Sequence, residues 1–140
     1  MAKLGPIILV EDDVEDQLLI REALEGSGNS HELKVFGNGE QVFEYLMHTS
    51  DKPFIIICDI NMPRMDGLAL RERINETEYL RRKSIPFVFF STTASRDSIE
   101  KAYELTVQGF FVKPSSFQDL TMTLGMIVSY WNVCKHPNKN

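Results

Sequence analysis

The sequence predicts an α/β domain, doubly wound, in which a five-stranded parallel sheet carries helices on both faces. Short apolar stretches alternate with segments of helical periodicity, which is the pattern of repeated β-α-β units. Right-handed crossovers would then place helices on both sides of the sheet. Polar side chains directly follow several of the apolar stretches, and in such a sheet the carboxyl ends of the strands share one edge.

Runs of β-branched and aromatic residues predict four of the strands, at 7–10, 54–57, 87–90 and 110–112. Residues 31–36 form a further run that is less apolar. We expect this strand at an edge of the sheet, because a fully covered parallel strand is usually apolar throughout.

Apolar residues at helical spacing predict five helices. The first ends within 26–30, the second follows Gly39, the third follows Gly67 and the fourth begins near Ser95. Their predicted core positions are Ile20, Ala23, Leu24, Val42, Phe43, Leu46, Leu70, Ile74, Ile99, Ala102, Tyr103 and Thr106.

The last helix has the clearest periodicity, with apolar residues at Phe117, Leu120, Leu124, Ile127, Val128 and Trp131. Ser116 and Asp119 have the spacing of a capping box at its start. Residues 76–84 are predicted as a polar connection, in which Tyr79 and Leu80 anchor the chain on the core.

Composition narrows the class of protein. The net charge of −5 argues against non-specific binding to nucleic acid. No apolar run approaches the roughly 18 residues that span a bilayer, and no signal peptide is evident, so we expect a cytoplasmic protein without membrane contact. Cys58 and Cys134 form no C-x-x-C pair and are expected as free thiols, and the three histidines as surface residues.

Acidic, hydroxyl and lysine side chains follow four of the strands: Glu11 to Asp13, then Asp59, Ser91 and Lys113. Carboxylates gathered at one sheet edge repel one another by about 4 kcal/mol per pair at ~4 Å, for an effective dielectric of about 20. They remain ionised together only beside a cation, and oxygen donors of this kind favour Mg²⁺. The pattern predicts a site for Mg²⁺ and a phosphoryl group.

The segment 58–67 reads Cys-Asp-Ile-Asn-Met-Pro-Arg-Met-Asp-Gly. With the acid run, Ser91 and Lys113-Pro114 in the same order, it resembles the response-regulator receiver domain, the phosphoacceptor half of two-component signalling. The resemblance implies the flavodoxin-like strand order 2-1-3-4-5. It also implies that Asp59 accepts a phosphoryl group from a sensor histidine kinase.

The resemblance assigns metal ligands by position. Asp12 would bind Mg²⁺ directly, Glu11 through a water, Asp59 as a further ligand and Asn61 through its backbone carbonyl. Asp13 would then begin the first helix. Because three acids run together, the pair Asp12 and Asp13 stays open as the alternative.

In the family, the lysine and the hydroxyl contact the phosphoryl oxygens, a role that falls here to Lys113 and Ser91. The family's switch pairs that hydroxyl with an aromatic residue on the fifth strand, here Phe110. Pro63, Gly67 and Pro114 would shape the loops: Gly67 by tolerating a positive φ, Pro114 through a cis peptide bond with Lys113.

We expect residues 1–140 to form a single receiver domain, with a core of about 5–133, a short polar tail and no output domain. Such a protein is not an enzyme, although it takes part in its own phosphorylation and dephosphorylation. Its output would be a downstream protein target, or a homodimer through the fourth helix, fifth strand and last helix. The 76–84 connection and the Tyr130-Trp131 ending resemble stand-alone regulators paired with phytochrome-type kinases.

Three other hypotheses about function compete with the receiver hypothesis. A flavin-binding electron carrier of this topology needs a phosphate loop after the first strand, where Glu11 to Asp13 would repel a phosphate. A phosphohydrolase with an aspartyl-phosphate intermediate needs an acid two residues after Asp59, and Asn61 cannot protonate a leaving group. A receiver used only as an unphosphorylated binding module is disfavoured by the complete acid cluster.

Overall fold

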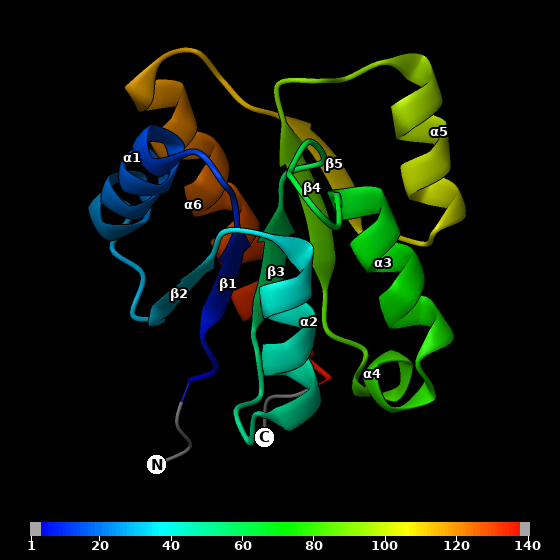
Figure 1. Cartoon of the computed structure of the whole chain (residues 1–140). Coiled ribbons are helices and arrows are strands. Elements are labelled where there is room, and N and C mark those ends of the chain that lie inside the picture. Colours follow the sequence, from blue (N-terminus) through cyan, green and yellow to red (C-terminus); the bar gives the residue numbers. More distant parts are fainter. Residues whose placement is uncertain (1–3, 138–140) are drawn as a thin grey trace.

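A computed structural model describes residues 4–137, which form a sheet covered on both faces by helices (Figure 1). All strand pairs are parallel, and the order is β2-β1-β3-β4-β5, as predicted. The strands are β1 Ile7–Val10, β2 Leu33–Phe36, β3 Ile55–Cys58, β4 Phe87–Ser91 and β5 Gly109–Val112. The predicted edge strand is β2, whose residues are only partly buried.

The helices are α1 Val14–Gly26, α2 Gly39–His48, α3 Gly67–Glu76, α4 Glu78–Lys83, α5 Arg96–Glu104 and α6 Phe117–Val133. Helices α1 and α6 lie together on one face of the sheet, and α2, α3 and α5 cover the other (Figure 1). In the part of the chain that the structure describes, no helix is long and apolar enough to span a membrane.

Alternate strand residues divide the core into two layers. Ile8, Val10 and Phe87 point toward α2, α3 and α4, whereas Ile7 and Leu9 point toward α1 and α6. Successive side chains of a strand face opposite ways, so a strand buried on both faces must be apolar at every position. This requirement explains the unbroken apolar runs of β1, β3 and β4, whose residues are all buried.

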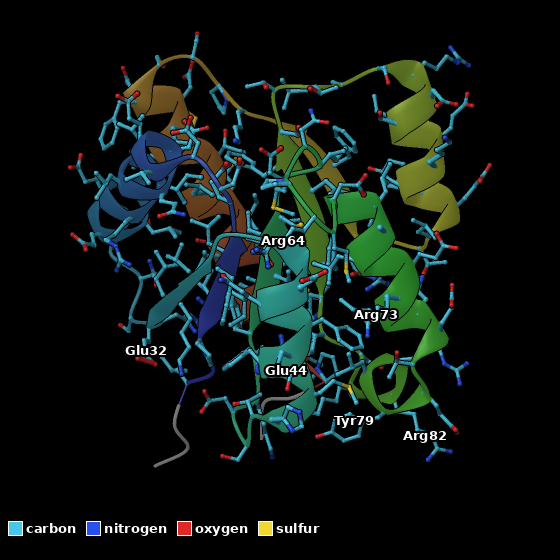
Figure 2. All side chains as sticks on the ribbon, in the orientation of Figure 1. Glu32, Glu44, Arg64, Arg73, Tyr79 and Arg82 are labelled. Carbon is cyan, nitrogen blue, oxygen red and sulfur yellow. The ribbon has the colours of Figure 1, made fainter. Side chains whose placement is uncertain are left out.

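Residues 76–84 are not the irregular connection that the sequence suggested. They contain the six-residue helix α4, which brings the described part of the chain to six helices instead of the five predicted. Leu80 is buried in the core as expected, but Tyr79 lies on the surface (Figure 2). The segment is too short and polar for periodicity to reveal the helix, which is held by the burial of Leu80.

Four further expectations about burial were wrong. Three residues assigned to helix core faces are exposed, namely Tyr103, Thr106 and Phe117. His136, expected on the surface, is buried against Phe54, with their ring centroids 5.1 Å apart. At the start of α6, Ser116 does cap the helix, because its hydroxyl accepts a hydrogen bond from the Asp119 N–H at 3.1 Å.

The loop between β3 and α3 is held by close backbone packing. The Gly67 N–H donates to the Ile60 carbonyl at 2.9 Å, and a Cβ on Gly67 would lie 2.3 Å from the Asp59 carbonyl oxygen. Gly67 does not have the positive φ that we expected; Arg64 has it instead, at 64°. Glycine is therefore required at position 67 for closeness to Asp59, and the bend after Pro63 is made by Arg64.

Replacing Gly67 with Ala should destabilise the protein by about 1–3 kcal/mol, because the added methyl group meets backbone that cannot give way. Urea denaturation measures this. Gly26→Ala is the matched control, since a Cβ there meets only the Thr121 methyl group at 3.9 Å. Equal stability of the two variants would show that the loop does not depend on this close approach.

Candidate functional site

The candidate site lies at the carboxyl edge of the sheet, where Glu11, Asp59 and Lys113 each follow a strand directly. Backbone hydrogen bonds extend the sheet by one residue at each place. The Glu11 N–H donates to Phe36 at 2.9 Å, that of Asp59 to Val10 at 3.0 Å and that of Lys113 to Ser91 at 3.0 Å. The sheet itself therefore positions these side chains.

Glu11, Asp12 and Asp59 form a cluster in which each residue offers a carboxylate oxygen within 4.8 Å of the others. Glu11 is buried, Asp59 half-buried and Asp12 exposed. The three oxygens suit a hard divalent cation, which prefers oxygen ligands and can keep several waters on an open side.

The geometry favours Glu11 with Asp12 over Asp12 with Asp13 as the acid pair. Asp13 is the N-cap of α1, where its side chain accepts a hydrogen bond from the Asp16 N–H at 3.1 Å. A carboxylate is well placed there, because it pairs with an otherwise unbonded helix N–H and with the positive end of the helix dipole. Asp13 is thus engaged locally.

Lys113 is the centre of the charge arrangement. Its nearly buried ammonium group contacts the carboxylates of Glu11, of Asp16 at 3.0 Å and of Asp59 at 3.4 Å. Burial alone would lower the pKa of Lys113, but its hydrogen bonds to Glu11 and Asp16 raise that pKa overall. Lys113 remains a cation throughout the physiological range.

Burial raises the pKa of Glu11 from 4.5 to about 7, although the hydrogen bonds from Lys113 and from the Asp13 N–H act in the opposite direction. One ammonium group shared among several carboxylates cannot compensate all of them. A cation placed beside Glu11 would stabilise its ionised form and lower this pKa again.

Ser91 is the last residue of β4, and Asn61 lies in the loop after β3, on the β4 side of the site. Ser91 is fully buried, and its hydroxyl accepts a hydrogen bond from the Thr93 N–H at 3.2 Å. The Asn61 side chain donates to the Thr93 hydroxyl at 2.6 Å, which ties the loop after β3 to the loop after β4. The role of the Asn61 backbone carbonyl as a metal ligand stays a prediction.

Sequence reasoning missed Asp16 and Thr93. Asp16 lies one helical turn beyond Asp12 and Asp13, and that spacing could have placed it on the same side of α1. Thr93 had no such signal, because its contact with Asn61 joins two loops that are far apart in sequence.

Phe110 and Pro114 lie next to the site. Phe110 is partly buried and packs against Phe89, with their ring centroids 6.0 Å apart, so its switch role stays a prediction. The expected cis bond between Lys113 and Pro114 is not found: every described peptide bond is trans, which is the commoner state even before proline.

All of the site residues described above lie in the part of the chain that matches one protein family. The model of the response regulator receiver domain matches residues 7–124. FilR2 of Methanothrix harundinacea is 33% identical over 129 residues, which cover 89% of this chain and 82% of FilR2. The response regulator Rcp1 of Synechocystis sp. is 32% identical over 130 residues, which cover 89% of this chain and 87% of Rcp1.

Solved structures agree with the sequence comparisons. The phosphorylated cyanobacterial phytochrome response regulator RcpA has a TM-score of 0.83 at 30% identity, covering 94% of this chain and 96% of RcpA. The Mn²⁺-bound form of Rcp1 has a TM-score of 0.82 at 29% identity, and the match covers 96% of this chain and 99% of Rcp1. Both neighbours match the fold over nearly the whole chain.

The raised pKa of Glu11 predicts how stability depends on pH in the metal-free protein. The folded state keeps a proton that the unfolded state releases between pH 4.5 and about 7, so the stabilisation is complete below 4.5 and is lost as pH rises through 7. Relative to Glu11→Gln, the wild type should lose roughly 1–3 kcal/mol of unfolding free energy across this window. Urea denaturation at a series of pH values, in a chelating buffer, measures this loss. The prediction is contradicted if the unfolding free energies of the wild type and Glu11→Gln change with pH in the same way.

Proposed function

Because this chain belongs to the response regulator receiver family of two-component signalling, we propose that it accepts a phosphoryl group on Asp59 from a sensor histidine kinase, with Mg²⁺ bound beside the acceptor. The observation that carries the proposal is the convergence of Glu11, Asp12 and Asp59 within 4.8 Å, with the Lys113 ammonium group against Glu11 and Asp59. This arrangement supplies an acceptor, a cation site and a fixed positive charge.

The proposed reaction is an in-line displacement at phosphorus. A carboxylate oxygen of Asp59 forms the new O–P bond as the P–N bond of the phosphohistidine breaks, and the imidazole leaves. Lys113 pairs with an oxygen of the transferring group, and Ser91 donates its hydroxyl to another. A divalent cation held by Asp12, Asp59, the Asn61 carbonyl and, through water, Glu11 would supply further neutralising charge.

Two properties support Asp59 as the acceptor. Its Oδ1 accepts a hydrogen bond from the Ile60 N–H at 2.7 Å, which orients the carboxylate, and its Oδ2 lies 3.4 Å from the Lys113 ammonium group. The orientation and the charge are both in place before any phosphodonor arrives. Preorganisation of this kind is most of what phosphoryl transfer requires of a protein.

The other readings have less support. Glu11 to Asp13 stand where an electron carrier would need a phosphate-binding loop. Asn61 leaves a phosphohydrolase without its general acid, so we propose a protein that does not turn over a substrate as an enzyme does. With no membrane-spanning helix in the described residues and a net charge of −5, the proposed setting is cytoplasmic, without nucleic acid.

We propose the surface of α5, β5 and α6 as the output face, which either self-associates or binds a downstream protein. Tyr103 is 51% and Tyr130 62% exposed. A groove of about 370 Å³ lies between β5 and α6, and Phe111, Met126 and Trp131 contribute to its lining. Exposed aromatic and methionine side chains of this kind are enriched in protein interfaces.

Asp59→Asn should abolish phosphorylation by a small phosphodonor in the presence of Mg²⁺, because the amide is not a nucleophile toward phosphorus. Intact-mass spectrometry of both proteins after equal incubation measures the added phosphoryl group. Asp66→Asn is a control, since Asp66 is the N-cap of α3 and its substitution should leave the modification intact. A phosphoryl mass on Asp59→Asn as abundant as on the wild type would refute the assignment.

Asp12→Ala should weaken Mg²⁺ binding by about tenfold or more, and Glu11→Ala by less, if Asp12 is the direct ligand and Glu11 acts through water. Calorimetric titration compares the variants. Asp13→Asn should leave the affinity within about twofold, because Asp13 caps α1. If Asp13→Asn proved to be the damaging change, the acid pair would be Asp12 and Asp13 instead.

A charge placed on the output face should reduce self-association or partner binding. If the face self-associates, Tyr103→Glu and Tyr130→Glu should shift the protein that carries a phosphoryl mimic from dimer toward monomer. If the face binds the kinase or a target instead, each variant should weaken that affinity by about tenfold. Light scattering and pull-down measure the two effects. Tyr79→Glu on α4 is the control, since Tyr79 is similarly exposed but lies on another side (Figure 2). If all three variants behaved as wild type, the output surface would lie elsewhere.

A further inference from the structure

A cavity of about 310 Å³ lies at the end of the domain opposite to Asp59. It is bounded by α3 and α4 and by the segments that lead into β4 and β5, so it opens at the amino ends of the strands. None of its lining residues belongs to the phosphoacceptor site. The proposed function leaves this cavity unexplained.

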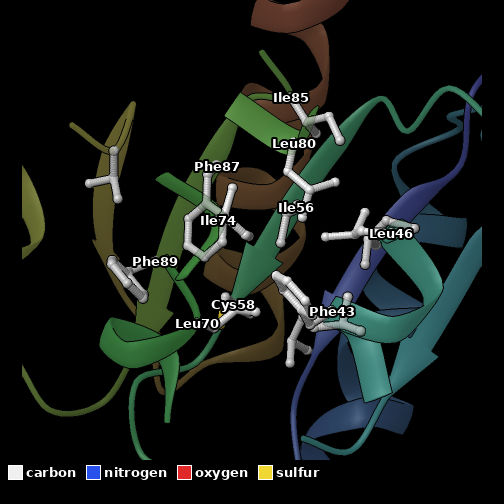
Figure 3. Packing of buried hydrophobic residues seen from close by; sticks show 14 of the residues in the cluster. Phe43, Leu46, Ile56, Cys58, Leu70, Ile74, Leu80, Ile85, Phe87 and Phe89 are labelled. Carbon is white, nitrogen blue, oxygen red and sulfur yellow. The ribbon is translucent and has the colours of Figure 1, made fainter. Parts of the chain in front are cut away.

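The cavity combines an apolar floor with a positively charged side. The floor is made by Leu46, Ile56, Ile74, Leu80 and Ile85, which pack together where α2, α3 and α4 meet the sheet (Figure 3). The polar side includes Arg71, Asn75, Arg81 and Ser84. Among the described residues, no aspartate or glutamate lines the cavity, although the chain carries a net charge of −5.

Arg71 is held in a fixed position on the polar side of the cavity. It is only 8% exposed, its Nε donates to the Leu105 carbonyl at 3.1 Å, and its Nη2 donates to the Thr106 carbonyl at 3.1 Å. Its Nη1 makes no hydrogen bond within the described chain. Every fully buried side-chain nitrogen in that part of the chain has a partner, so Nη1 is not fully buried and solvent can reach it. Arg71 also has no carboxylate partner among the described residues.

Arg81 supplies a second guanidinium group at the same cavity. Its side chain forms no ion pair within residues 4–137, whereas the adjacent Arg82 pairs with Glu78 at 3.5 Å. Arg81 is exposed, so water solvates its charge, whereas the buried Arg71 has no carboxylate partner, and an anion that enters the cavity would supply that counter-charge. The planar guanidinium fork matches a carboxylate in particular.

We propose that this cavity binds a small organic carboxylate with an apolar body. The carboxylate would accept hydrogen bonds from Arg71 and Arg81, and the apolar body would lie on the floor formed by Ile74, Leu80 and Ile85. The floor disfavours a fully hydrated inorganic anion, because such an ion has no apolar surface to bury against it and would have to give up its own water shell. Binding here does not depend on Asp59.

Such a ligand would also act on the turn between α5 and β5. Arg71 holds the carbonyls of Leu105 and Thr106 at the end of α5, and Asn75 donates to the Leu105 carbonyl at 2.8 Å. A carboxylate that engages Arg71 therefore changes the charge beside that turn. The amide signals of Leu105 and Thr106 should respond together with those of Leu80 and Arg81.

The test is a titration of the full chain with benzoate, followed by amide NMR, with benzyl alcohol as the uncharged counterpart. Saturable shifts at Leu80, Arg81, Leu105 and Thr106 are expected for benzoate and not for benzyl alcohol. Arg81→Gln should weaken benzoate binding by about five- to tenfold through the loss of one charge-assisted contact. Arg71→Gln should weaken it further, but Arg71 also holds α5, so Arg81→Gln is the decisive variant.

Arg82→Gln is the matched control, because it removes the same charge from the same helix on the side that faces solvent (Figure 2). It should leave benzoate affinity within about twofold. The proposal is overturned if benzoate gives no saturable shifts at the cavity, if benzyl alcohol reproduces them, or if Arg82→Gln weakens binding as much as Arg81→Gln. Asp59→Asn should bind benzoate as the wild type does, which separates this result from any failure of the phosphoacceptor proposal.

Discussion

The contact of the Lys113 ammonium group with Glu11, Asp16 and Asp59 is the interaction on which the carboxyl edge of the sheet depends. Parallel strands bring their ends to one edge, and this sheet brings several carboxylates with them. Without a cation, that crowding opposes folding. Lys113 enters from β5, at the far edge of the sheet from β2, so the charge balance of the site also joins the first, third and fifth strands.

At the carboxyl edge of the sheet, close contacts fix the conformations of the loops that follow β3 and β4. Gly67 admits the Asp59 carbonyl at a distance that no side chain would allow, and Asn61 fixes the loop after β3 to Thr93 in the loop after β4. These contacts hold the backbone that presents Asp59. The Lys113 N–H also donates to the Ser91 carbonyl, and this bond joins β4 to β5 beside Asp59.

At the opposite end, the domain meets a different electrostatic requirement. Arg71 is buried against backbone carbonyls at the end of α5, where the negative end of the helix dipole favours a cation, and its guanidinium lies over the Phe87 ring with 5.2 Å to the centroid. These carbonyl dipoles compensate part of the charge of Arg71, which has no carboxylate partner among the described residues. This leaves positive charge at the α3 and α4 side of the molecule, while the sheet edge that carries Asp59 is acidic.

The sequence alone determined the strands and the polar residues that follow them, because both rest on local signals, whereas the strand order was predicted from the family resemblance. Apolar runs such as 7–10 and 54–57 must be buried on both faces, and Asp59, Ser91 and Lys113 could be placed at one edge because they lie at or just beyond the ends of such runs. Tertiary structure decided what depends on contacts between distant segments. It made Asp13 a helix cap and Glu11 a buried partner of Lys113, folded 78–83 into a helix over the core, and buried His136 and Arg71. Local periodicity cannot encode these outcomes, because each is stabilised by groups that lie far away in the chain.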